Sequence, residues 1–278
     1  MPSGALNRFV GRLLLLLSIL ALVAGPTQAQ GTLEKIKERG KLLAGVRYDY
    51  PPIGVLGADG KPEGFGVELA KLFAEKLGVQ VEYVQVISKT RFALLQNGNI
   101  DAEFGPTTPS VDREQVADFS IPYVWDGVVL LIKKGGSTKL ADYAPPKKIA
   151  LTQGSNIGDM IKEHVPTAQF ARFQEYPDAV TALKNDKVDA VGINKFVGLT
   201  MAKKDPGLEI SEDFFVDPWA ITIRQNDTKW RSFVNVAMQE LWLSGKYQEL
   251  YEKHFGVKPN FKMWSEFRLQ PGVGVKSN

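Results

Sequence analysis

The chain has 278 residues, 44% of them hydrophobic and 23% charged, a composition that excludes extended disorder and allows one large domain or two of ordinary size. It contains no cysteine, which excludes disulfides, thiolate metal sites, a cysteine nucleophile and a lipid anchor on cysteine. The formal net charge of +3 includes Arg8 and Arg12 of the first segment, so the charge does not indicate a nucleic-acid partner.

The first predicted element is a secretory signal peptide over residues 1–29. Arg8 and Arg12 precede the apolar run LLLLLSILALVAG, and small residues lead to Ala29. This order is typical of export signals, and the run is shorter than the roughly 20 residues of a membrane span. We therefore expect cleavage after Ala29 and a mature periplasmic protein of a Gram-negative cell without a lipid anchor. The alternative is an uncleaved membrane anchor.

Strands and helices are then predicted to alternate. KLLAGVRYD (41–49), VQVEYVQVI (79–87) and NIDAEFGP (99–106) have the composition of strands, whereas GVELAKLFAEKLG (66–78) and TRFALLQNG (90–98) have a helical period. A second set follows, with strands in KKIALTQGS (147–155), AQFARFQ (168–174) and VDAVGIN (188–194), and helices in NIGDMIKEHV (156–165) and YPDAVTALKND (176–186). A last long helix is predicted to begin at the N-cap Asp227. These repeats predict an α/β fold.

Two further strands are predicted to cross between domains. GVVLLIKKGG (127–136) separates the two sets of repeats, and PWAITIRQND (218–227) returns the chain to the first set. We expect two lobes, each with a central sheet flanked by helices, and the crossing strands as the hinge. Lobe one takes residues 30–128 and 222–278, and lobe two takes residues 129–221.

Open α/β sheets bind ligands beyond the carboxyl ends of their strands, so the candidate binding residues are those that follow each predicted strand. They are Arg47, Ser88, Arg91, Thr107, Thr108, Arg113, Thr152, Ser155, Tyr176 and Asn194. The arginines stay charged and present a planar fork of donors that matches a carboxylate. The alternatives are a surface ion pair for Arg113, a structural or solvated role for Arg47 and Arg91, helix capping for Thr107, Thr108 and Ser155, and a turn for Asn194.

Other chemistry has little support in the sequence. Neither GxxxxGK[ST] nor GxGxxG occurs, and neither His164 nor His254 has a neighbour at metal-ligand spacing. We predict no cofactor, no metal and no catalytic residue.

Several segments carry a family resemblance. GFGVELAKLFAEKLG, LLQNGNIDAEFGPTTPSVDREQVADFSIPY, LTQGSN and SGKYQELYEKHFG resemble the family 3 solute-binding proteins of ABC transporters, from about Gly31 to about Gly256. SKTRFALLQNG and GPTTPSVDR are most similar to the glutamate/aspartate-binding branch. The resemblance implies the type II periplasmic-binding-protein fold and a monomer that delivers a polar amino acid to an inner-membrane ABC permease.

The resemblance also implies roles for individual residues. Arg113 matches the arginine that binds the ligand α-carboxylate, and Thr108, Thr152 and Ser155 assist it. Positions that hold the side-chain carboxylate in the acidic-amino-acid branch match Arg47, Ser88 and Arg91. Tyr176 stands where that branch has a histidine, and Pro106 replaces a serine.

Asn194 is the most informative departure, because the family commonly has there an aspartate that pairs with the ligand ammonium. Three arginines facing glutamate or aspartate would leave two positive charges uncompensated, and an unpaired buried charge costs several kcal/mol. The pocket would then favour an amine-free dicarboxylate such as succinate or 2-oxoglutarate, unless Glu103, Asp126 or Asp217 supplies the missing charge.

The leading prediction is therefore a binding protein for glutamate, aspartate or a related carboxylate, with the amine-free dicarboxylate as the alternative. A third reading is an enzyme, because some proteins of this fold act as periplasmic dehydratases on arogenate or prephenate; Glu103 would be its acid or base. A fourth is a sensory module that docks onto a receptor.

Overall fold

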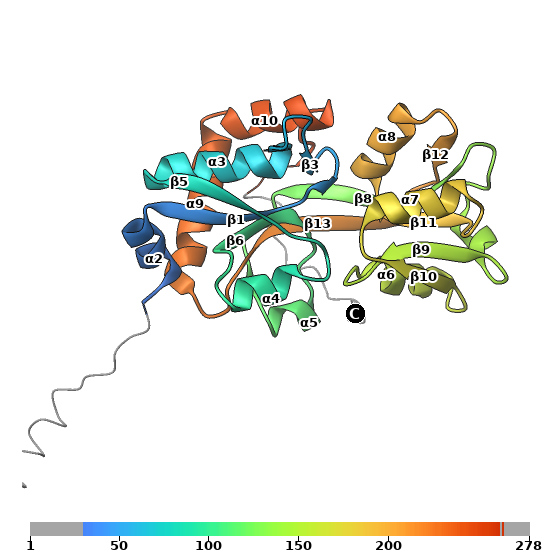
Figure 1. Cartoon of the computed structure of the whole chain (residues 1–278), viewed down its shortest axis with the longest axis horizontal. Helices are drawn as coiled ribbons and strands as arrows, with labels where there is room; N and C mark the ends of the chain where they lie inside the picture. Colours follow the sequence, from blue (N-terminus) through green and yellow to red (C-terminus); the bar gives the residue numbers. More distant parts are fainter. Residues whose placement is uncertain (1–29, 262, 264–278) are drawn as a thin grey trace, which may run out of the picture. The chain divides into compact units, whose positions relative to one another are not determined.

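The computed structural model describes residues 30–261 and 263, and its compact unit begins at Thr32 (Figure 1). The predicted signal peptide lies outside the described residues. Within the described part of the chain, no helix is long and apolar enough to span a membrane.

The elements of this unit follow the predicted alternation of strands and helices. The strands are β1 (Lys41–Val46), β2 (Asp49–Tyr50), β3 (Gly54–Leu56), β4 (Pro62–Glu63), β5 (Gln80–Gln85), β6 (Ala102–Thr107), β7 (Asp118–Phe119), β8 (Val124–Lys133), β9 (Lys148–Thr152), β10 (Gln169–Phe173), β11 (Ala190–Asn194), β12 (Leu208–Ile210) and β13 (Phe215–Ile223). The helices are α2 (Thr32–Arg39), α3 (Phe65–Leu77), α4 (Arg91–Gln96), α5 (Val111–Glu114), α6 (Ile157–His164), α7 (Tyr176–Lys184), α8 (Lys195–Lys204), α9 (Thr228–Leu243) and α10 (Lys246–Phe255), with a short 3-10 helix η1 (Leu140–Tyr143).

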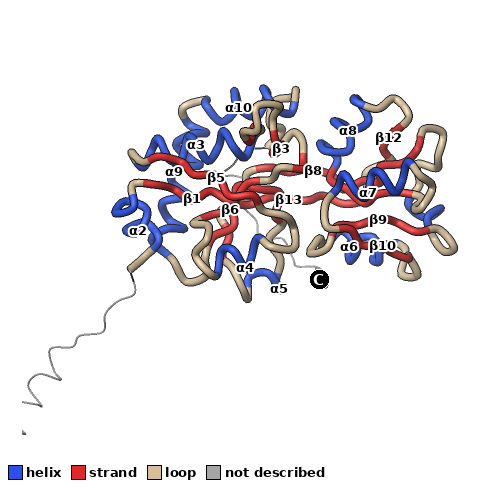
Figure 2. The backbone as a smooth tube through the Cα atoms, in the orientation of Figure 1, coloured by secondary structure: helices blue, strands red, loops and turns tan. Residues whose placement is uncertain are grey.

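Two long central strands join two parallel groups of strands. In the described residues the main sheet has ten strands, in the order β10-β9-β11-β8-β13-β6-β1-β5, with β12 beside β8 and β7 beside β13. β1 is parallel to β5 and β6, and β9 is parallel to β10 and β11. β8 and β13 are antiparallel to each other and run through both groups (Figure 2). The predicted crossing strands are these two, and the predicted lobe boundaries near residues 128 and 221 fall inside them.

The two groups of strands form the two lobes of the predicted α/β fold. In lobe one, α3 and α10 lie on one side of β1, β5 and β6, and α4 and α5 lie on the other (Figure 1). In lobe two, α6, α7 and α8 surround β9, β10 and β11 (Figure 1). The predicted architecture, a central sheet flanked by helices in each lobe, is confirmed.

Local signals explain where the predicted helices begin and end. α3 buries Leu69, Ala70 and Phe73 on its inner face, and Gly78 ends it with φ of +69°, a left-handed conformation that suits glycine. Asp227 caps α9 by accepting a hydrogen bond from the Trp230 amide at 3.1 Å, as predicted.

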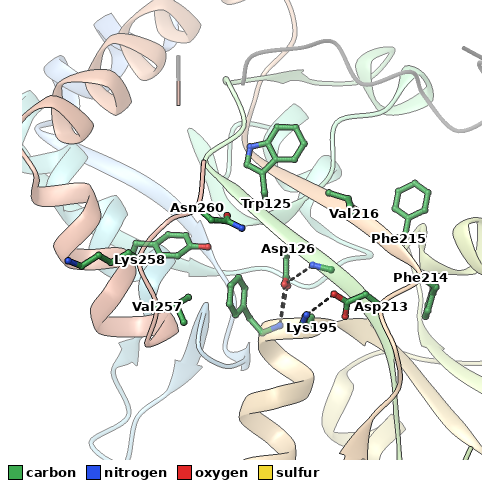
Figure 3. A pocket seen from close by; sticks show the side chains of 13 residues that line it. Trp125, Asp126, Lys195, Asp213, Phe214, Phe215, Val216, Val257, Lys258 and Asn260 are labelled. Carbon is green, nitrogen blue, oxygen red and sulfur yellow. Dashed lines mark hydrogen bonds and ion pairs between the residues drawn. The ribbon is translucent and has the colours of Figure 1, made fainter. Parts of the chain in front are cut away.

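A buried carboxyl lies on the crossing strand β8, opposite Asp217 of β13. The Asp126 carboxylate of β8 accepts hydrogen bonds from the backbone amides of Gly127 and Phe196 (Figure 3). It lines a hollow of about 800 Å³ that Trp125, Phe196 and other residues enclose. Burial raises the pKa of Asp126 to about 8, although both amides act in the opposite direction.

This position predicts a pH-dependent difference in stability between the wild type and Asp126→Asn. Between about pH 4 and pH 8 the folded chain keeps a proton on Asp126 that the unfolded chain has lost, so the stability that the proton contributes falls as pH rises. The amide of Asn keeps an acceptor and has no proton to lose. We expect urea unfolding to show that Asp126→Asn gains at least about 1 kcal/mol over the wild type between pH 5 and pH 9. If the difference in the free energy of unfolding between the two proteins did not change with pH, the raised pKa of Asp126 would be contradicted.

Candidate functional site

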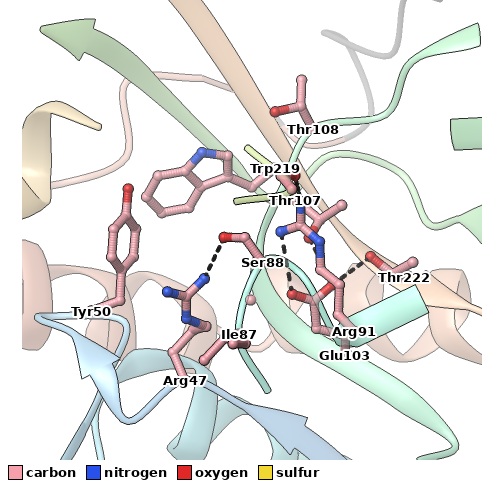
Figure 4. A network of polar contacts seen from close by, with 12 residues as sticks. Arg47, Tyr50, Ile87, Ser88, Arg91, Glu103, Thr107, Thr108, Trp219 and Thr222 are labelled. Carbon is pink, nitrogen blue, oxygen red and sulfur yellow. Dashed lines mark hydrogen bonds and ion pairs between the residues drawn. The ribbon is translucent and has the colours of Figure 1, made fainter. Parts of the chain in front are cut away.

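The structure brings most of the predicted binding residues together where the strands of both lobes end. Arg47, Ser88, Thr108, Thr152 and Asn194 end or follow β1, β5, β6, β9 and β11. Figure 4 shows Arg47, Ser88, Arg91 and Thr108 around one network of polar contacts. The parallel strands of each lobe therefore place distant parts of the sequence at one site, as expected for this kind of sheet.

Arg47 is buried and is held by an aspartate that the sequence analysis did not single out. Its Nε and Nη2 atoms each donate to a different carboxylate oxygen of Asp49 at 2.8 Å, and Nη1 donates to Ser88 Oγ at 2.9 Å. The guanidinium also lies 5.0 Å from the centre of the Tyr50 ring and 6.0 Å from that of Tyr176. Its bidentate face is thus occupied by the protein itself.

Arg91 lies above Glu103, with its Nη1 3.8 Å from Glu103 Oε1, and both side chains are buried (Figure 4). The other carboxylate oxygen accepts hydrogen bonds from the hydroxyls of Thr107 at 2.7 Å and Thr222 at 2.8 Å. Thr107 therefore donates its hydroxyl hydrogen bond to Glu103 and not toward the space between the strand ends. Arg91 Nε and Glu103 Oε1 are buried without a hydrogen-bond partner among the described residues, so Arg91 keeps a donor that is not satisfied.

Arg113 differs from the other two arginines in having no carboxylate within 4 Å among the described residues. Its Nη1 donates to the Thr108 carbonyl at 2.9 Å, and its Nη2 lies 3.4 Å from the Gly154 carbonyl. It lines a hollow of about 310 Å³ together with Gly154, Ser155 and Asp159. Desolvation and the nearby charge of Arg91 lower the pKa of Arg113 to about 9. The Arg113 guanidinium is therefore placed to bind the carboxylate of a ligand.

Asn194 ends β11 of lobe two, and both the oxygen and the nitrogen of its side-chain amide form hydrogen bonds. Its Oδ1 accepts from the Tyr50 hydroxyl at 2.7 Å, and its Nδ2 donates to Asp217 at 2.6 Å. Asp217 also accepts from the Thr108 hydroxyl and from Trp219 Nε1. Tyr176 is buried against Tyr50, with ring centres 4.7 Å apart.

The lobe-two turn approaches lobe one closely. Gly154 has φ of +79°, and a Cβ there would meet the Ser88 carbonyl oxygen at 2.5 Å. Its own carbonyl accepts from Arg91 and Arg113 of lobe one. Ser155 Oγ accepts from the Ile157 amide at the start of α6, whereas the Thr152 hydroxyl is buried without a partner among the described residues.

The carboxylates change the count of charges on which the sequence argument depended. Glu103 and Asp217 do lie with the arginines, Asp126 does not, and Asp49 adds a third negative charge. A signal for Asp49 was present, because a residue two positions after Arg47 in extended chain points to the same side. These three carboxylates balance the three arginines, and Asp159 lines the hollow beside Arg113 as a further negative charge, so the predicted excess of positive charge is not there.

The family model for bacterial extracellular solute-binding proteins, family 3, matches residues 42–257. The chain belongs to this family. It is 32% identical to the L-cystine-binding protein TcyJ of Escherichia coli K12 over 86% of this chain and 92% of that protein. It is 30% identical to the ABC transporter glutamine-binding protein GlnH of Bacillus subtilis over 85% of this chain and 89% of that protein.

The predicted glutamate/aspartate branch is one of several among the relatives. An L-glutamate/L-aspartate-binding protein of Pseudomonas aeruginosa is 26% identical over 90% of this chain and 91% of its own length. Two solved structures match with a TM-score of 0.76 over 81% of this chain. They are a mutant of ArgBP from T. maritima, 31% identical and covered fully, and the ancestral amino acid-binding protein AncCDT-1, a precursor of cyclohexadienyl dehydratase, 30% identical and covered to 99%.

The contacts predict different consequences for the arginines. Arg47→Met would leave Asp49 buried without its partner, so we expect the free energy of unfolding to fall by about 3 kcal/mol. Arg113→Met removes a cation without a carboxylate partner and should cost less than about 1 kcal/mol. Urea unfolding of the ligand-free proteins measures both values. If both variants lost the same free energy of unfolding, the distinction between Arg47 as a structural residue and Arg113 as an arginine without a carboxylate partner would be contradicted.

Proposed function

We propose that this protein captures an α-amino acid between its two lobes in the periplasm and delivers it to an ABC permease without chemical change. The proposal is supported by the family and by relatives and solved neighbours that are named as amino-acid-binding proteins. Arg113 carries it most directly, since this arginine has no carboxylate partner among the described residues and lies beside the hollow at Gly154. In this proposal Arg113 binds the α-carboxylate, as the resemblance implies.

We further propose that the ligand's side chain is uncharged. The three arginines are balanced by Asp49, Glu103 and Asp217, and Asp159 lies beside Arg113 in the hollow, so a zwitterion has the advantage that it adds no negative charge. Glutamate or aspartate would add a negative charge, and an uncompensated buried charge costs several kcal/mol. Arg47 is held by Asp49 on its bidentate face, which argues against a second carboxylate there.

The acidic amino acids stay the second candidate for a specific reason. Arg91 Nε is a buried donor without a partner among the described residues, and the carboxylate of a ligand side chain would satisfy it. An amide or carbonyl oxygen of an uncharged side chain would satisfy it as well, without adding charge. The two candidates therefore differ in charge and not in the contact they make.

The enzyme alternative has weaker support. Glu103, its predicted acid or base, accepts from Thr107 and Thr222 and faces Arg91 beneath the site. A general acid or base must reach the proton it transfers, and Glu103 is wholly buried. Absence of product after incubation with prephenate, followed by mass spectrometry, is the expected result.

Calorimetric titration of refolded protein with three matched ligands tests the proposal. L-glutamine and L-glutamate differ in the charge of the side chain, and L-glutamate and 2-oxoglutarate differ in the amine. We expect glutamine to bind at least about tenfold more tightly than glutamate, and glutamate more tightly than 2-oxoglutarate. Tighter binding of glutamate would restore the acidic-amino-acid prediction. Binding of 2-oxoglutarate or succinate alone would contradict recognition of an amino acid.

Arg113→Ala should weaken binding of L-glutamine by at least about 2 kcal/mol, because the ligand carboxylate would be buried without its partner. Calorimetry measures the affinity, and thermal unfolding verifies that the variant is folded. Arg172→Ala, at an exposed position on β10, is the control and should leave the affinity unchanged. An unchanged affinity for Arg113→Ala would remove Arg113 from the site.

A further inference from the structure

Asp217 is a buried carboxylate that contacts predicted binding residues of both lobes. It lies on the crossing strand β13 and is 2% exposed. Its Oδ1 accepts from the Thr108 hydroxyl of lobe one, and its Oδ2 accepts from Asn194 Nδ2 of lobe two at 2.6 Å and from Trp219 Nε1 at 3.0 Å. The sequence analysis named it as one of three carboxylates that could supply the missing charge, without placing it in the fold.

The amide of Asn194 has no charge to offer a cation, and its contacts are already defined. Its Oδ1 accepts from the Tyr50 hydroxyl, and its Nδ2 donates to Asp217. Among the described residues, Asp217 is the carboxylate that contacts this amide. A carboxylate accepts about four hydrogen bonds, of which three are made here, so one position is left for a further donor.

Thr108 places this carboxylate close to the free arginine. Its carbonyl accepts from Arg113 Nη1 at 2.9 Å, and its hydroxyl donates to Asp217. The two charges thus stand on either side of one residue without forming an ion pair with each other. The carboxylate and ammonium of an α-amino acid are bonded to the same carbon, so their binding groups must also lie about one residue apart.

We propose that Asp217 supplies the negative charge that binds the ligand's α-ammonium, in place of the charge that Asn194 lacks. This inference rests on the proposed function, because it concerns the amine of the same amino acid. Asn194 then acts as a positioning residue that holds the Asp217 carboxylate through its amide. Burial raises the pKa of Asp217 in spite of its three donors. A bound cation would offset the cost of removing the negative charge of Asp217 from water.

The simpler reading is that Asp217 only anchors Thr108, Asn194 and Trp219. Asp217→Asn keeps the shape and an acceptor but loses the charge. The double variant Asn194→Asp with Asp217→Asn restores the charge on the other side of the same hydrogen bond. Its stability should lie close to that of the wild type, so it keeps the test valid if the single variant unfolds.

The probes are L-glutamine and glutaramic acid, which is glutamine without its α-amine. We expect the wild type to prefer glutamine strongly, and Asp217→Asn to weaken glutamine about thirtyfold while glutaramic acid binds as well or better. The double variant should recover glutamine affinity to within about tenfold of the wild type. Calorimetry measures each affinity, with thermal unfolding as the control for folding.

Equal weakening of both probes by Asp217→Asn would show a structural role and overturn the inference. So would an unchanged affinity for glutamine, or a folded double variant that stays as weak as the single one. If Arg113→Ala abolishes glutamine binding while Asp217→Asn does not affect it, the proposed function is supported and the binding of the α-ammonium by Asp217 is contradicted. If the wild type binds neither glutamine nor any other α-amino acid with an uncharged side chain, the proposed function fails and the inference fails with it.

Discussion

The arrangement of this site depends on the need to pair charges that are removed from water. Burying an arginine costs several kcal/mol unless an anion and further hydrogen bonds compensate it. Arg47 meets this need through Asp49, and Arg91 meets it in part through Glu103. Arg113 and Asp217 do not pair directly, and Thr108 contacts both. One cation and one anion therefore lie on either side of Thr108 without a direct ion pair between them.

The crossing strands make this arrangement possible. β13 belongs to the sheet contacts of both lobes, so Asp217 reaches Thr108 on one side and Asn194 on the other. The turn at Gly154 completes the enclosure because its missing side chain lets its backbone approach Ser88 and the two arginines. In this family-3 fold, the hinge thus contributes a charged group to the site it encloses.

The sequence was sufficient for the architecture because each signal was local. Each of these signals is contained in a segment of no more than about twenty residues. They are the helical period of α3, the Asp227 cap of α9 and the two crossing strands. α8 was missed, since Gly198 and a polar second half weaken its apolar stripe. The family motif also led to Arg113, whose position beyond β6 places it beside the hollow.

The partners of the arginines were harder to predict. Thr108 and Asp217 are 109 positions apart, and only the pairing of β13 with its neighbours brings them together. Asp217 could be recognised from the sequence as one carboxylate that would change the charge count, but no local pattern places it beside Thr108. Asp49 was overlooked although it lies two residues after Arg47. As a result the fold was predicted well, whereas the partners of the arginines were not.

The most direct measurement is the identity of the small molecule that accompanies the natively purified protein. Denaturing that protein and analysing the released molecules by mass spectrometry requires no choice of ligand in advance. We expect an α-amino acid with an uncharged side chain, present in near-equal amount to the protein. Release of an amine-free dicarboxylate would contradict this expectation, because the carboxylate of Asp217 would then face the ligand without a cation.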